Sequence, residues 1–420
     1  MEPAGRLDPQ PWMTAPATVA VMAALGDAGA VARFVGGCVR DAVLGRTVKD
    51  IDIATDAEPG GVLAALRDAG VRAVPTGLDH GTVTAVREGR PFEITTLRHD
   101  VETFGRRARV AFTDDWAADA ARRDLTLNAL YCDADGTLYD PVGGLADLKA
   151  GRVRFVGAAR ARIEEDVLRL LRFFRFHAHY GQGAPDEAAL AACAEMAPRL
   201  EVLSAERVWM ELKRLLAAPD PASVLDIMAQ RGALEHVLPE ASRRDRLRAL
   251  CDLEAALGRD PDPVLRLAAS AALDGRAADA VALRLRFSNA DRGRLIRLAA
   301  PEAEVAPAMD ERARRVALYR LGAATFADLV LIGWAEEAAL GGGDIERGNA
   351  AAWRALLAAS GRWKDLSLPV GGADAMALGV PRGPEIGNLL GRLETWWIGE
   401  DFRPGRKACL DRLRALVGKA

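Results

Sequence analysis

The sequence has few cysteines and no long apolar run, and each absence argues against a class of protein. Its five cysteines are scattered along 420 residues without a C-x-x-C pair, which argues against a disulfide framework and against a zinc site. The five histidines show no metal-ligand spacing. No stretch of about 18 apolar residues lacks charge, and Glu2 and Asp8 stand where a secretory leader would be basic. We therefore expect a cytoplasmic protein with no membrane, disulfide or zinc partner.

An excess of positive charge is also missing. The net charge is -3 and the pI is about 6.1, so any binding of nucleic acid would require a local basic surface. The chain is half hydrophobic and long enough to bury a large core, which predicts two or more domains.

The stretch from Phe34 to Asp56 carries the strongest local pattern. A short run rich in β-branched residues ends at Gly36 and Gly37, and a short helix is expected to follow. The start of a helix offers unpaired N–H groups and partial positive charge to a phosphate, and Arg40 in its first turn would add a charge-assisted contact. A glycine pair before a helix is more often an ordinary tight turn, so this pattern needs support from its neighbours.

That support comes from Asp50 and Asp52, which alternate with isoleucines on the next predicted strand. Alternate side chains share one face of a strand, with Cα atoms roughly 6.5 to 7 Å apart. Two carboxylates held this way repel each other unless a cation lies between them, so the pair predicts a Mg²⁺ site. A solvated strand face is the plainer explanation. Glu93, on the second strand of a predicted hairpin, would be a third acid if that strand lies beside the Asp50 strand.

The rest of the first 150 residues is less regular. Residues 1–13 are expected to be disordered or loosely attached. Arg98 to Trp116 loses periodicity and is basic, which predicts a functional loop or lid. Arg122 to Leu130 is expected to be a helix that leads into a hairpin at residues 131–140. Its arginine pair, Arg122 and Arg123, is most often surface charge, but beside a phosphate site the two arginines would neutralise a triphosphate.

Beyond residue 150 the composition becomes rich in Ala, Leu and Arg at helical spacing, which predicts an all-α body. A helix from about Ile163 to Tyr180 would place Asp166, Arg169, Arg172 and Arg175 on one face and bury the other. Internal salt bridges are the plainer explanation for these charges. The alternative is base recognition, because a carboxylate beside a guanidinium matches the amino donor and ring acceptor of cytosine and adenine but not of uracil or guanine.

Six motifs occur in the order typical of one family. They are G-G-C-V-R-D with D-I-D (36–52), G-L-D-H-G-T-V-T with F-E-I-T-T-L-R (77–98), R-R-D-L-T-L-N-A-L (122–130), D-P-V-G-G-L-A-D-L (140–148), E-D-V-L-R-L-L-R-F-F-R-F (165–176) and S-A-E-R-V-W-M-E-L-K-R-L-L (204–216). In these motifs the chain resembles the polymerase β-type nucleotidyltransferases, and in particular the class II CCA-adding enzymes and their bacterial poly(A) polymerase relatives.

The resemblance implies an α+β fold in three parts: a nucleotidyltransferase head (1–150), a nucleotide-recognition and connecting helical domain (151–235), and a helical tRNA-binding body and tail (236–420). It implies that Asp50 and Asp52 hold two Mg²⁺ ions. It also implies that the basic segment after Glu93 helps to switch from C to A addition. The residues that it assigns to the nucleotide are Gly36, Gly37, Arg40, Arg123, Asp166, Arg169, Arg172 and Arg175.

The implied reaction is template-independent addition of C, C and A to the 3′ end of tRNA, using CTP and ATP. The downstream helices, including residues 243–297 and 368–398, would hold the tRNA acceptor end and elbow. The alternatives are a poly(A) polymerase that uses ATP, an enzyme that adds only CC or only A, and an RNA-binding protein without catalysis. The intact Asp50 and Asp52 argue against the last. His99-Asp100 has no second histidine at useful spacing, so no phosphohydrolase site is expected.

Overall fold

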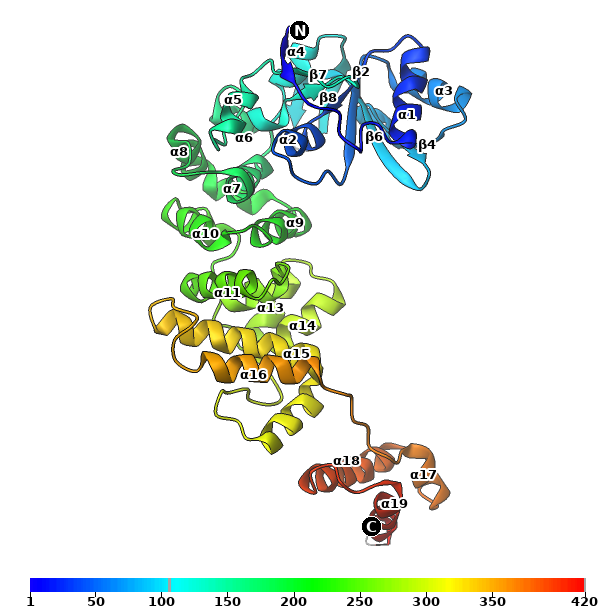
Figure 1. Ribbon diagram of the computed structural model, residues 1–420, viewed down its shortest axis with the longest axis vertical. Helices are drawn as coiled ribbons and strands as arrows, with labels where there is room; N and C mark the ends of the chain where they lie inside the picture. Colours follow the sequence, from blue (N-terminus) through cyan, green and yellow to red (C-terminus); the bar gives the residue numbers. More distant parts are fainter. Residues whose placement is uncertain (105–106, 419–420) are drawn as a thin grey trace. The chain divides into compact units, whose positions relative to one another are not determined.

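The computed structural model describes residues 1–104 and 107–418, and it divides into two compact units, Met1–Pro239 and Glu240–Ala420 (Figure 1). The first unit combines a sheet with helices, and the second is helical in its described part. The predicted α+β architecture is confirmed.

The first unit is built on a mixed sheet of eight strands in the order β1-β10-β9-β2-β3-β6-β5-β4. The β3·β6 pair is parallel, and the other six pairs are antiparallel. The strands are β1 (Pro3–Arg6), β2 (Ala32–Val35), β3 (Ile51–Thr55), β4 (Arg72–Gly77), β5 (Thr82–Arg87), β6 (Arg90–Thr96), β9 (Tyr131–Cys132) and β10 (Thr137–Tyr139).

The centre of this sheet places the predicted acidic strand beside the predicted hairpin. In the β3·β6 ladder Asp52 is the register partner of Glu93, and the flanking isoleucines Ile51 and Ile53 pair with Phe92 and Ile94. All four flanking side chains are buried, so the alternation along each strand places Asp52 and Glu93 on the face that points away from the core. The expectation that the Glu93 strand lies beside the aspartate strand is confirmed.

Three helices of the head pack against this sheet. Helix α1 (Pro16–Asp27) packs on α3 (Pro59–Asp68), and both contact β5, while α2 (Gly37–Val43) packs on β2 and β3. The core beneath them consists of large, fully buried side chains, among them Phe34, Ile53, Leu66, Phe92 and Ile94.

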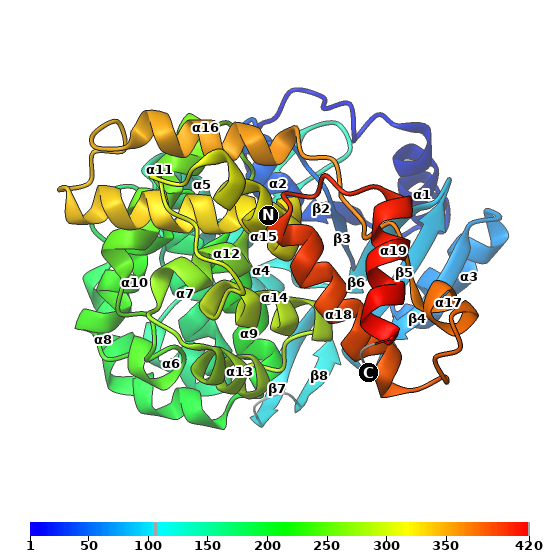
Figure 2. The same ribbon diagram turned by 90° about the horizontal axis from the view of Figure 1, so that it is seen from below.

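Two expectations about irregular segments are wrong. Residues 3–6 form β1, which pairs with β10 at the sheet edge; all four side chains are exposed, so no apolar pattern marks the strand. The segment after β6 is not a loop but a ribbon of two antiparallel strands, β7 (Arg98–Phe104) and β8 (Arg107–Phe112), outside the main sheet (Figure 2). The strands of a separate two-stranded ribbon need not show the alternation that a sheet covering a core requires.

The segment Arg122 to Leu130 is not the expected helix. Helix α4 (Trp116–Ala121) ends just before it, and the segment continues as a turn with one short 3₁₀ turn, Thr126–Asn128. Every residue from Asp124 to Leu130 is buried. A segment buried on all sides loses the contrast between faces from which periodicity distinguishes helix from extended chain.

The D-P-V-G-G motif forms the start of helix α5 (Gly144–Lys149). The carboxylate of Asp140 accepts from the backbone N–H groups of Gly144 and Leu145, at 2.7 and 2.9 Å. A β-carbon at Gly144 would lie 2.2 Å from the carbonyl oxygen of Thr126. The second glycine is therefore required by a backbone contact with the R-R-D-L-T segment.

We expect Gly144→Ala to lower the free energy of unfolding by about 1–3 kcal/mol, because the added methyl group meets backbone that it cannot displace cheaply. Gly60→Ala in α3 is the matched control, since a β-carbon there has no atom within 4 Å; it should be neutral or stabilise by up to about 1 kcal/mol. Urea unfolding of both variants measures the difference. Equal stabilities would contradict the clash.

The remaining helices of the first unit are α6 (Ala159–Glu165), α7 (Leu168–Tyr180), α8 (Glu187–Met196), α9 (Ala205–Leu216) and α10 (Pro221–Gln230). Helix α7 packs against both α9 and α10, with its phenylalanines buried. The expectation that this apolar helix is internal is confirmed.

The second unit contains helices only among its described secondary-structure elements. They are α11 (Arg244–Ala256), α12 (Pro263–Ser270), α13 (Gly275–Arg284), α14 (Asn289–Ala299), α15 (Glu311–Leu340), α16 (Ala350–Gly361), α17 (Gly372–Ala377), α18 (Pro384–Gly399) and α19 (Arg406–Val417). Helix α15 is interrupted at Gly322, whose φ of 74° and ψ of 157° belong to a region open almost only to glycine.

Helix α15 is long and apolar enough, by length and composition, to cross a membrane. It nevertheless carries the buried Asp328, which accepts from Arg294 at 2.8 Å, and it packs on α11, α12, α14 and α16. A buried, ion-paired carboxylate within a helix packed on four others is explained by a core helix of this unit.

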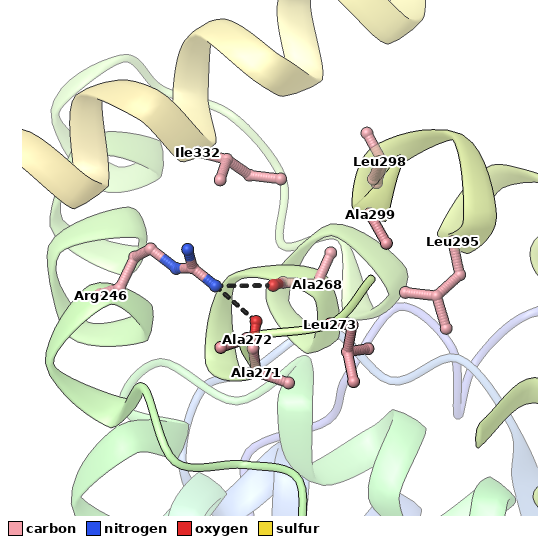
Figure 3. A pocket seen from close by; sticks show the side chains of 9 residues that line it. All are labelled: Arg246, Ala268, Ala271, Ala272, Leu273, Leu295, Leu298, Ala299 and Ile332. Atoms are coloured by element: carbon pink, nitrogen blue, oxygen red, sulfur yellow. Dashed lines mark hydrogen bonds between the residues drawn. The ribbon is translucent and has the colours of Figure 1, made fainter. Parts of the chain in front are cut away.

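Arg246 has a structural role at the end of α12. It donates to the carbonyl oxygens of Ala268 and Ala271 (Figure 3). It also donates to the carbonyl oxygen of Ala269 and to Glu336 on α15. Cationic side chains stabilise the carbonyl end of a helix in this way. The pocket beside Arg246 is otherwise lined by alanine, leucine and isoleucine, and we assign it no ligand.

Candidate active site

The candidate site begins at the turn between β2 and α2. Gly36 has a φ of 71°, and its N–H donates to the carbonyl oxygen of Leu130 at 3.1 Å. A β-carbon at Gly36 would lie 3.6 Å from the carbonyl oxygen of Asn128 and 3.8 Å from Nη1 of Arg123. The first glycine therefore lets the turn approach the R-R-D-L-T-L-N segment, and Gly37 starts the helix.

Asp52 lies beside this turn and is surrounded by charged side chains. Burial raises its pKa to about 6, with further increases from the charges of Glu93 and Asp50, while Arg123 and Arg40 oppose the rise. Two acids and two guanidinium groups thus act electrostatically on one carboxylate. A cation placed here would relieve the repulsion between the acids.

No group of three or more Asp, Glu, His or Cys side chains in the described part of the chain is gathered closely enough to hold a metal ion alone. A metal at Asp50 and Asp52 would therefore take further ligands from its substrate and from water. This is the usual arrangement for Mg²⁺ at sites that bind phosphates.

Arg40 and Arg123 are held in place by side chains on both sides of the turn. Arg40 donates to Asn128 Oδ1 at 2.6 Å and lies 4.2 Å from the centre of the Tyr180 ring. Arg123 donates to Asp119 Oδ2 at 2.8 Å and to the hydroxyl of Tyr131 at 3.2 Å. The idea that the arginine pair is surface charge is wrong, because the side chains of Arg122 and Arg123 are only 15% and 18% exposed.

The single helix expected from Ile163 to Tyr180 is wrong at Asp166. Helix α6 ends at Glu165, Asp166 has an extended backbone with φ -151° and ψ 109°, and α7 begins at Leu168. The Asp166 side chain accepts from the N–H of Leu168 at 3.1 Å. This local hydrogen bond competes with continuation of the helix, so Asp166 and Arg169 do not share a helical face.

All four predicted charges in this region have partners within the first unit. Asp166 accepts from Arg207 at 2.6 Å, and Arg169 is paired with Glu165. Arg172 donates to Asp124 and Arg175 to Glu211, both at 2.6 Å. The internal salt bridges favoured by the sequence are therefore present.

These pairs also join α7 to the segment that carries Arg123. Arg172 contacts Asp124, and Arg169 Nη2 donates to the carbonyl oxygen of Arg122 at 3.4 Å. The residues immediately before and after Arg123 are thus both bound to α7. The structure brings the two sets of predicted nucleotide-binding residues together.

The structure adds residues that the sequence did not single out: Asp119, Asp124, Asn128, Tyr131 and Arg207. Asp119 lies three and four positions before Arg122 and Arg123, a spacing at which helical side chains meet, so it was open to prediction. Arg207 reaches Asp166 from another helix, and its position in the sequence gives no sign of the contact.

We expect Asp124→Ala to lower the free energy of unfolding by about 3 kcal/mol, because it leaves Arg172 without its carboxylate. Burial alone would raise the pKa of Asp124, but Arg172 and hydrogen bonds from Asn128 and Leu125 lower it to about 2. A lowered pKa contributes stability above the ordinary value of 3.8, and this is lost as the pH falls toward 2.

The difference between wild type and Asp124→Ala should therefore shrink between pH 4 and pH 2 when unfolding is followed by circular dichroism. Asp68→Ala removes the exposed pair with Arg67 and should cost less than about 1 kcal/mol at any pH. A pH-independent difference for Asp124→Ala would contradict the ionic assignment.

Asp52 lies on β3 and Asp50 lies directly before that strand, not on it as expected. A mixed sheet with this acidic strand, beside a glycine turn and the guanidinium groups of Arg40 and Arg123, defines a nucleotidyltransferase head. Comparison with known proteins agrees. Residues 32–154 match the Poly A polymerase head domain, and residues 184–244 match a probable RNA and SrmB-binding site of polymerase A.

The chain is 34% identical over 389 residues to CCA tRNA nucleotidyltransferase 1, mitochondrial, of Danio rerio, covering 91% of this chain and 86% of that protein. It is 39% identical over 222 residues to the CCA-adding enzyme of Geobacillus thermodenitrificans, covering 52% and 54%. The crystal structure of the Bacillus stearothermophilus CCA-adding enzyme in complex with CTP superposes with a TM-score of 0.71 at 26% identity, over 96% and 97% of the two chains. This chain belongs to the CCA tRNA nucleotidyltransferase family and is a nucleotidyltransferase.

Proposed function

We propose that this chain adds C, C and A to the 3′ end of tRNA from CTP and ATP. The observation that carries the proposal is the β3 strand, where Asp52 stands in register with Glu93 beside the Gly36 turn. The relative from Danio rerio, named for this activity, matches nearly the whole chain and supports the proposal. So does the structural relative that was crystallised with CTP.

Membership of the family implies a divalent cation, and we assign Mg²⁺ to Asp50 and Asp52 with Glu93 as a further candidate ligand. The donor set fits, because these are hard oxygen ligands, and because the charges of Glu93 and Asp50 add to the effect of burial in raising the pKa of Asp52. A bound divalent cation would supply charge stabilisation at the reacting phosphoryl group and would favour ionisation of the attacking 3′-hydroxyl.

The triphosphate is assigned to the turn and its guanidinium groups. Gly36 forms the turn, with its own N–H bonded to Leu130, and Gly37 presents its N–H at the start of α2. Arg40 and Arg123 supply positive charge from the two sides. Because both guanidinium groups are already fixed by internal hydrogen bonds, little side-chain entropy would be lost when they bind phosphate.

The base is assigned to Asp166 and Arg169. Each oxygen of Asp166 accepts one hydrogen bond in the protein, from Leu168 N–H and from Arg207, and each retains a lone pair for an exocyclic amino group. Arg169 donates three of its five N–H groups within the protein. Arg172 and Arg175 are assigned to the same base-binding site, where their ion pairs with Asp124 and Glu211 hold them in place.

We assign the tRNA acceptor end and elbow to residues 236–420. In the run 243–297 several arginines are paired within the second unit, among them Arg243, Arg266, Arg284, Arg292 and Arg294. These pairs stabilise helix packing, so RNA contacts are expected mainly from other cations of this unit. The division at residues 150 and 235 and the cytoplasmic location remain predictions; the relatives include mitochondrial and bacterial proteins.

The test is extension of tRNA transcripts that end before CCA, after CC, or after the complete CCA, with Mg²⁺ and each nucleotide alone or CTP with ATP. We expect two additions of C, then one of A, and none of U or G. Long tails made from ATP alone would instead identify a poly(A) polymerase. Arrest after CC, or activity only on the CC-ending transcript, would identify an enzyme limited to CC or to A.

A further inference from the structure

Asp119 on α4 is a buried carboxylate that holds two adjacent guanidinium groups. Its side chain is 1% exposed. One oxygen accepts from Nε and Nη2 of Arg122, at 2.8 and 2.5 Å, and the other from Nε and Nη2 of Arg123, at 3.2 and 2.8 Å. One negative charge therefore faces two positive charges, which leaves a local excess of positive charge.

The hydroxyl of Tyr131 completes the restraint on Arg123. It donates to Asp119 Oδ2 at 2.8 Å and accepts from Arg123 Nε at 3.2 Å. The guanidinium group of Arg123 is thus fixed by Nε and Nη2, while Nη1 donates to the carbonyl oxygen of Asn128 at 3.4 Å and lies 3.8 Å from the position that a β-carbon would take at Gly36. Its other edge is directed toward the turn to which the triphosphate is assigned.

The same carboxylate is connected to the base of the β7–β8 ribbon. Arg122 Nε, which donates to Asp119, also donates to the carbonyl oxygen of Arg98 at 3.0 Å, and the N–H of Arg98 lies 3.5 Å from Asp119 Oδ1. Arg98 is the first residue of β7. Arg122 also accepts from Arg169 through its carbonyl oxygen. The buried carboxylate of Asp119 is therefore connected to the β7–β8 ribbon, to Arg123 and, through Arg122, to Arg169, which is assigned to the base.

We propose that Asp119 is a positioning residue, which sets the orientation of Arg123 for the nucleotide and couples it to the base of the ribbon. The inference rests on the proposed function, because it gives Arg123 a triphosphate to bind. Asp119 itself is buried behind the guanidinium groups and is not expected to touch the substrate.

The test compares Asp119→Asn with Asp147→Asn. Asp147 is an equally buried carboxylate of the head that accepts from Arg154 at 2.8 Å and from Thr126 at 2.7 Å, and it pairs with Arg152. Both variants should lose thermal stability. Asp119→Asn alone should raise the KM for CTP and ATP and lower kcat/KM by about 10- to 100-fold, because catalysis is sensitive to small displacements of positioning groups.

A double-mutant cycle with Arg123→Ala separates positioning from general damage. If Asp119 acts through Arg123, adding Asp119→Asn to Arg123→Ala should change kcat/KM less than about twofold. The inference would be overturned if Asp119→Asn lowered kcat/KM as much in the Arg123→Ala background as it does alone. It would also be overturned if Asp119→Asn alone left kcat/KM unchanged. If Asp119→Asn fails to fold, Tyr131→Phe is the second variant, because it removes only the hydroxyl that restrains Arg123. It should also raise the KM for CTP. An unchanged KM in Tyr131→Phe would overturn the inference.

Equilibrium dialysis of CTP on the same variants distinguishes this inference from the proposed function. A wild-type chain that extends no tRNA, but whose CTP binding is weakened by Asp119→Asn and not by Asp147→Asn, would refute tRNA extension and support the positioning role. CTP binding that is equal in all three proteins would overturn the positioning role, whatever the activity of the wild type.

Discussion

Asp52→Asn is expected to lower the rate of nucleotide addition by about 10³-fold or more while the protein remains folded. Charge stabilisation by a metal site contributes several kcal/mol to such reactions, and each 1.36 kcal/mol is tenfold in rate. The amide keeps the size of the side chain and removes its charge. Single-turnover addition of C to tRNA ending before CCA measures the loss.

The same substitution should raise the stability of the metal-free protein. Because the pKa of Asp52 is raised to about 6 in the folded state, its ionised form opposes folding. That cost is absent below the ordinary value of 3.8, grows as the pH rises, and is complete above about 6. In EDTA, the melting temperature of Asp52→Asn should therefore exceed that of the wild type at pH 7.5 by more than at pH 5.

Asp56→Asn is the matched control, since Asp56 lies just beyond the same strand and accepts from the N–H of Val31 at 2.9 Å. It should leave activity within about twofold. Glu93→Gln should also raise the metal-free stability, because the charge of Glu93 raises the pKa of Asp52. Asp52→Asn with more than a tenth of wild-type activity would contradict the assignment of a metal to this strand.

The β2–α2–β3 unit was predictable because its determinants are local. β-Branched residues before a glycine pair, and isoleucines alternating with aspartates, specify strand, turn and strand without help from distant parts of the chain. The register of Asp52 with Glu93 needed one more condition, that β3 and β6 are neighbours. The hairpin pattern predicts both strands of β5·β6, but only the fold decides which edge β3 joins.

The errors concern segments whose environment is decided elsewhere in the chain. Leu125 and Leu127 are buried together with the polar residues between and around them, so the sequence shows no apolar face from which a helix or a strand could be recognised. β1 forms because β10 offers it an open edge. Asp166 breaks a sequence of good helix formers because its side chain bonds to Leu168, and Arg207 holds it from 41 residues away. Such contacts depend on tertiary approach, which single-sequence periodicity does not contain.

Asp166→Asn is expected to change which bases are accepted. The amide replaces one acceptor with a donor, so it no longer matches the amino groups of cytosine and adenine and instead suits the carbonyl groups of uracil and guanine. Sites built on polar edges discriminate by about 10⁴- to 10⁵-fold. We expect the ratio of kcat/KM for CTP over UTP to fall by about 10²-fold or more, measured on tRNA ending before CCA.

Arg207→Gln tests whether the orientation of this carboxylate matters apart from its charge. Arg207 donates to Asp166 Oδ2 at 2.6 Å, while the N–H of Leu168 still holds Oδ1. The variant should therefore lower kcat/KM for CTP and ATP together, through looser positioning, and keep the preference for CTP over UTP.

An unchanged CTP to UTP ratio in Asp166→Asn would contradict base recognition by Asp166. The pair with Arg207 would then be explained by stability alone, and the base would have to be recognised by Arg169 or by backbone groups of the same pocket.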